Sequence, residues 1–97
     1  MRVVGEIPHP DVKITIFHWN NRYLIKLEAG PFEQTFKLEE YDISSEGELK
    51  EIVNETFIQQ SIERFNSMAQ SLRQATQFLW AFFIAFSALT LLTPISP

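Results

Sequence analysis

Alternating hydrophobic and polar residues between positions 12 and 29 predict a β-hairpin. Asn20-Asn21 divides this run, and asparagine tolerates the positive φ that a two-residue type I′ turn requires. Such a turn makes Trp19 face Arg22 and thereby sets the register of the other pairs. One face of the hairpin is then the predicted core, formed by Val12, Ile14, Ile16, His18, Tyr23, Ile25, Leu27 and Ala29.

The opposite face of the hairpin is predicted to carry an ion pair and an aromatic cluster. Lys13 faces Glu28 in this register, and the two side chains are expected to pair. Phe17, Trp19 and Leu24 gather near the turn. Exposed aromatic clusters tend to anchor interfaces, so we predict that these three residues form an interaction site on the soluble side. An ordinary dimer interface at the same residues is an equally good interpretation.

A third strand and an N-terminal arm flank the hairpin in the predicted fold. Gly30-Pro31 ends the second strand, and the alternating run 32–38 predicts an antiparallel strand that returns beside it. Residues 1–11 contain Pro8 and Pro10, which fix φ and favour extended conformations before them. We therefore predict a three-stranded antiparallel meander preceded by an extended arm or edge segment.

Helical patterns begin after residue 44. The segment Ser45-Glu46-Gly47-Glu48 matches a capping box and predicts the start of a short helix. From Thr56 a longer helix is predicted, because hydrophobic residues recur at spacings of three and four. Its expected buried face consists of Ile58, Ile62, Phe65, Ala69 and Leu72. The predicted fold class is α+β.

The C-terminal part of this long helix is strongly apolar. No charged residue follows Arg73, and Pro94 ends the helix. Residues 75–93 would extend roughly 28 Å as a helix, close to the ~30 Å hydrocarbon thickness of a bilayer. We predict a single membrane span there, with the N-terminal domain in the cytoplasm because Arg64 and Arg73 precede the span. The alternative is a cytoplasmic protein whose aromatic helix is buried between copies.

Two stripes divide the apolar segment. Small residues allow another helix to approach closely, whereas an aromatic stripe suits a large membrane protein or a flat cofactor. Alternatively, the residues of both stripes face lipid and contact no specific partner. The predicted helix-packing residues are Ala81, Ala85 and Ala88 in the small stripe, and Phe78, Phe82 and Phe86 in the aromatic stripe.

Charge and composition argue against several classes of function. The net charge is −4, with only eight Lys and Arg residues, which argues against nucleic-acid binding. The chain has no cysteine, and its two histidines, His9 and His18, have too few neighbouring ligands to predict a metal site. Seven acidic residues between Glu39 and Glu55 suit a helix N-terminus, or alternatively a docking patch for a basic partner. We find no paired nucleophile and base, and expect no catalytic residue and no cofactor.

These observations predict an organisation and a role. The expected parts are an arm (1–11), a small sheet-and-helix domain (12–74), the apolar helix (75–93) and a tail (94–97). The expected function is that of a non-enzymatic accessory subunit or adaptor, held at a lipid bilayer and bound to a larger membrane protein complex. The alternative is a soluble homo-oligomeric binding module that pairs with a second copy of itself.

Overall fold

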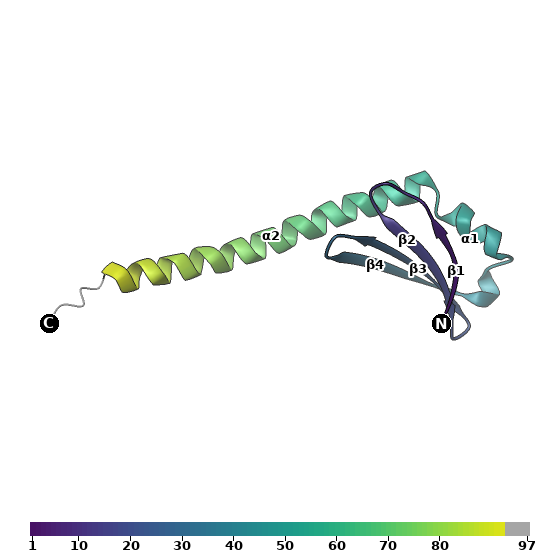
Figure 1. Cartoon of the computed structure of the whole chain (residues 1–97), viewed down its shortest axis with the longest axis horizontal. Coiled ribbons are helices and arrows are strands. Elements are labelled where there is room, and N and C mark those ends of the chain that lie inside the picture. Colours follow the sequence, from purple (N-terminus) through teal and green to yellow (C-terminus); the bar gives the residue numbers. More distant parts are fainter. Residues whose placement is uncertain (93–97) are drawn as a thin grey trace. The chain divides into compact units, whose positions relative to one another are not determined.

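The computed structural model describes the backbone of residues 1–92 and the side chains of residues 1–77 (Figure 1). The chain divides into two compact units, Met1–Asn66 and a second that begins at Ser67. In chain order the elements are β1 (Arg2–Ile7), β2 (Lys13–Trp19), β3 (Arg22–Ala29), β4 (Phe32–Glu39), the short 3₁₀ helix η1 (Glu40–Asp42), α1 (Glu46–Ile52) and α2 (Glu55–Leu92).

The first unit contains a four-stranded antiparallel sheet with strand order β1-β2-β3-β4. The α+β class is confirmed, but the prediction of three strands is wrong, because β1 pairs with β2 inside the segment that we expected to be an arm. Its register shifts between Val3 and Gly5, so that the regular two-residue alternation is interrupted. Because of this bulge, the sequence of β1 lacks the regular alternation of hydrophobic and polar residues by which a strand is predicted.

The predicted hairpin register is confirmed from Trp19↔Arg22 to Lys13↔Glu28. Asn20 and Asn21 have φ values of 54° and 60°, as a type I′ turn requires. Val12 is buried, although it lies beyond the end of this ladder. Local turn chemistry therefore sets the pairing of the two central strands.

The core lies on the predicted face of the sheet, where α1 and α2 cover it. Ile14, Ile16, Ile25 and Leu27 are almost completely buried there, as is Leu49 from α1. Each of these side chains contributes about 1.5–3 kcal/mol through burial of apolar surface. The central strands are therefore the most strongly stabilised part of the fold.

An exposed ion pair joins α1 to β1. A guanidinium nitrogen of Arg2 lies 3.0 Å from the Glu46 carboxylate. A Cβ added at Gly5 would lie 3.8 Å from Cε of Lys50, which is ordinary van der Waals contact. The capping box is present in altered form, since Glu48 accepts a hydrogen bond from the amide of Ser44 (2.7 Å) while the Ser45 side chain makes no capping bond.

Helix α2 begins one residue before the predicted position. Asn54 caps it by accepting a hydrogen bond from the Phe57 amide at 2.9 Å. Ile58 and Phe65 are buried as predicted, and Ser61 is fully buried between them. The prediction for Leu72 is wrong, because this side chain is exposed. The buried face of α2 thus ends within the first unit.

Candidate interaction surface

The face of the sheet opposite the helices carries an apolar patch over three strands. The ladders place Val3, Phe17 and Leu24 in one row across β1, β2 and β3. Trp19 lies one row nearer the β2–β3 turn on the same face, because side chains two positions apart point to the same side. We call Met1, Val3, Phe17, Trp19 and Leu24 the open-face patch.

Exposure differs within the open-face patch. Met1, Val3 and Trp19 are 74%, 57% and 52% exposed, which is high for large apolar side chains. Phe17 is half-buried and Leu24 is buried. The three residues predicted from the sequence therefore share one face, but Trp19 is the member that a partner would reach first.

Leu24 also lines a cavity on this face. Its volume is about 180 Å³, and its lining comprises Met1, Phe17, Leu24, Lys26, Glu33 and Thr35. Met1 and Val3 were not predicted as members of this surface, because the sequence pattern did not indicate strand β1. The Val3-Val4 pair, typical of strands, was the available signal.

A charged cluster borders the open-face patch on β3 and β4. Lys26 Nζ lies 3.5 Å from a carboxylate oxygen of Glu28 and 3.5 Å from one of Glu33. Glu28, followed by Glu33, raises the pKa of Lys26 above its ordinary value. The predicted Lys13–Glu28 ion pair is not formed, because Glu28 pairs with Lys26 instead. The patch consequently has polar sides, which is the usual anatomy of a protein interface.

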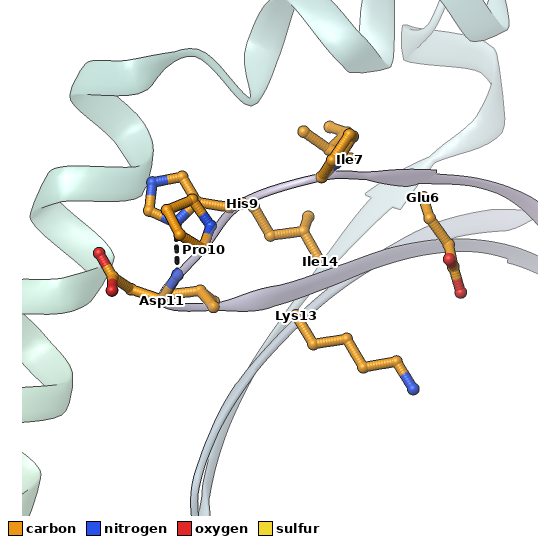
Figure 2. A pocket seen from close by; sticks show the side chains of 9 residues that line it. Glu6, Ile7, His9, Pro10, Asp11, Lys13 and Ile14 are labelled. Atoms are coloured by element: carbon orange, nitrogen blue, oxygen red, sulfur yellow. Dashed lines mark hydrogen bonds between the residues drawn. The ribbon is translucent and has the colours of Figure 1, made fainter.

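A hollow lies at the β1–β2 turn (Figure 2). It has a volume of about 540 Å³ and is lined by residues 6–14. His9 accepts a hydrogen bond from the Asp11 amide at Nδ1 (3.1 Å), and its Nε2 lies 3.7 Å from the Glu55 carboxylate. Glu6 and Lys13 point to the opposite side of this turn from Ile7. His9 thus positions the turn against the start of α2.

His18 lies at the end of the covered face, as predicted. Its ring meets Tyr23 edge-on with 5.0 Å between the ring centres. Nε2 is 3.3 Å from a Glu40 carboxylate oxygen, yet it has no hydrogen bond of good geometry within the described residues. Among the described residues, His18 is not part of a group of three side chains that could bind a metal ion.

A polar network attaches α2 to β4. Arg64 donates to the Gln34 side chain (2.9 Å) and to the Ser61 hydroxyl (3.1 Å), and its guanidinium lies 5.7 Å from the ring centre of Phe36. Gln34 in turn donates to the carbonyl of Ser61 at 2.9 Å. Phe57 meets Phe36 edge-on at 5.1 Å. These side chains satisfy one another, so the network is a structural attachment.

Metal-binding groups and membrane-spanning helices were sought in the part of the chain that the structure describes. No three His, Cys, Asp or Glu side chains gather there in a way that could hold a metal ion. No helix of that same part is long and apolar enough to cross a membrane.

The residues predicted for the C-terminal helix lie outside those with described side chains. This applies to Phe78, Ala81, Phe82, Ala85, Phe86 and Ala88, and to nearly all of the predicted span 75–93. The predicted tail 94–97 lies beyond the described backbone as well. The membrane span and its helix-packing residues remain predictions.

Comparisons with protein-family models, with curated proteins and with solved structures find no match for this chain. The candidate interaction surface therefore rests on its own geometry.

Proposed function

We propose that this protein is a non-enzymatic adaptor that holds a small sheet domain at a membrane and presents its open-face patch to a larger protein complex. The observation that carries the proposal is the contrast between the two faces of the sheet. Helices cover one face, whereas Trp19, Val3 and Met1 remain exposed on the other. An exposed aromatic side chain among apolar neighbours and flanking charges is typical of an interface anchor.

Attachment to the membrane is proposed from the sequence of residues 75–93. This segment carries no charged side chain, and as a helix its length of roughly 28 Å comes close to the ~30 Å hydrocarbon thickness of a bilayer. Trp80 near its start suits the membrane interface, and the preceding Arg64 and Arg73 favour a cytoplasmic location for the sheet domain. Ala81, Ala85 and Ala88 are the residues at which a neighbouring helix would approach most closely.

A charge placed within the apolar segment tests the membrane attachment. In Phe82→Arg, insertion becomes about 3 kcal/mol less favourable, so that the protein leaves the alkaline-washed membrane fraction. Gln59→Arg is the matched control, because Gln59 is exposed on α2 within the first unit, and it should remain in the membrane fraction. Full-length protein that is soluble and assembled without lipid would instead support the homo-oligomeric alternative.

A second variant tests the open-face patch separately from the membrane attachment. Trp19→Ser should leave the protein in the membrane fraction and folded, since Trp19 is exposed. The complex that the protein forms in mild detergent should become smaller, which native size analysis measures. An unchanged complex would show that the partner binds elsewhere.

A further inference from the structure

The two edges of the sheet differ in how well they resist pairing with another strand. In β1 the bulge between Val3 and Gly5 interrupts the edge. The other edge, β4, pairs with β3 at eight consecutive positions without any shift in register. Within the described residues no strand pairs with its outer side. A regular, uninterrupted edge of this length is a template for a further strand.

The backbone of β4 shows which residues would bond to that strand. Ala29 and Phe32 flank a two-residue turn, and the Glu40 amide donates to the Asn21 carbonyl at 3.1 Å. Residues at even positions of β4 therefore direct their amides and carbonyls toward β3. Residues at odd positions, Glu33, Thr35 and Lys37, direct theirs outward. A further antiparallel strand must pair with these odd positions.

The outward positions of β4 are complementary to themselves. When two β4 strands pair with Thr35 opposite Thr35, Glu33 of each copy faces Lys37 of the other. A register shifted by two residues one way places Glu33 opposite Glu39, and a shift the other way leaves Lys37 opposite Pro31. Opposite charges in facing positions stabilise a strand pair and like charges destabilise it. One register is therefore preferred over its neighbours.

The covered face of β4 also has apolar surface that a neighbouring strand would bury. Phe32, Phe36 and Leu38 are only half-buried, whereas Ile25, the partner of Phe36 on β3, is 1% exposed. In the preferred register Leu38 of one copy faces Phe32 of the other, and Phe36 faces Gln34. Pairing would thus extend the apolar core across the junction.

We propose that a second copy of this chain binds along β4, so that two sheets join into one eight-stranded antiparallel sheet. The two-fold axis passes through the Thr35 pair, and both open-face patches lie on the same side of the joined sheet. A single strand pair is a small interface, and the association is accordingly weak and concentration-dependent. The inference is independent of the proposed membrane attachment and of the adaptor role.

Single cysteines test the register directly, because the natural chain contains none. In the full chain, kept in mild detergent, Thr35→Cys should form a disulfide dimer on mild oxidation, since the two Cα atoms would lie about 5.5 Å apart. Lys13→Cys is the control, because Lys13 is exposed on the same face of β2. We expect cross-linking at position 35 to be at least about tenfold faster than at position 13. Equal rates would overturn the proposal.

A charge exchange tests the same register without a cross-link. Lys37→Glu makes two Glu–Glu pairs in each dimer and should weaken association about tenfold, as sedimentation equilibrium measures. The double variant Glu33→Lys with Lys37→Glu restores opposite charges and should recover the association. Dimers that are insensitive to both changes would show that the copies meet through another surface and would contradict the proposal.

Discussion

The two units of this chain differ in what stabilises them. The first buries apolar side chains from four elements, among them Leu27, Leu49 and Phe65, against one another. In residues 67–77, the part of the second unit with described side chains, no side chain is buried. The Thr76 hydroxyl there bonds only to carbonyls of its own helix, those of Leu72 and Arg73. The first unit therefore has a hydrophobic core of its own, whereas the described side chains of the second unit bury nothing against one another.

The same substitution in the two units should give the largest contrast. Leu27→Ala removes a side chain with no exposed surface and should lower the free energy of unfolding of the first unit by about 2–5 kcal/mol. Leu72→Ala removes an exposed side chain and should change it by less than about 0.5 kcal/mol. Chemical denaturation monitored by circular dichroism measures both. Equal effects would mean that the core extends past Asn66.

The cap of α2 should have an intermediate effect. Asn54→Ala leaves the Phe57 amide without its acceptor and should destabilise the first unit by about 1 kcal/mol. Asn54→Asp keeps an acceptor oxygen at the same place and serves as the control. The midpoint of urea unfolding reports both variants. A loss of equal size in both would show that the capping bond is not the cause.

The smallest expected effect concerns the Lys26 cluster and pH. Glu28 and Glu33 raise the pKa of Lys26 above its ordinary value of 10.5. The stabilising contribution is therefore complete below the unfolded-state pKa and is lost as the pH rises through the higher folded-state pKa. The difference in unfolding midpoint between the natural chain and Lys26→Met should shrink between about pH 9 and pH 12. A constant difference would show that Lys26 stabilises the sheet by packing alone.

Local chemistry made part of this fold predictable. The turn at Asn20-Asn21 defines the β2–β3 register. Because side chains alternate between the two faces of a strand, this register places Phe17, Trp19 and Leu24 on one face. Strand β1 was not predicted for two reasons. Its pairing is irregular after Val3, and residues 8–12 connect it to β2 in place of a tight two-residue turn. Pro8 and Pro10 also favoured an arm over a strand.

Tertiary contacts explain what the sequence pattern missed in the candidate surface. Leu24 is buried and lines a cavity together with Met1, whose position depends on the pairing of β1. Glu28 forms an ion pair with Lys26 and not with Lys13, although the register that places Lys13 opposite Glu28 was predicted correctly. Side-chain partners within a correct register depend on rotamers and on the next strand, and neither can be deduced from alternation.

Amide hydrogen exchange on the full chain, in buffer and with lipid vesicles, tests the difference between the two units most directly. We predict that amides of the buried strands β2 and β3 are protected equally in both conditions, because the first unit supplies its own core. Amides of residues 75–92 should exchange rapidly in buffer and slowly with vesicles. Slow exchange of 75–92 in buffer without lipid would contradict the membrane account and would indicate that copies of the chain bury this helix between them.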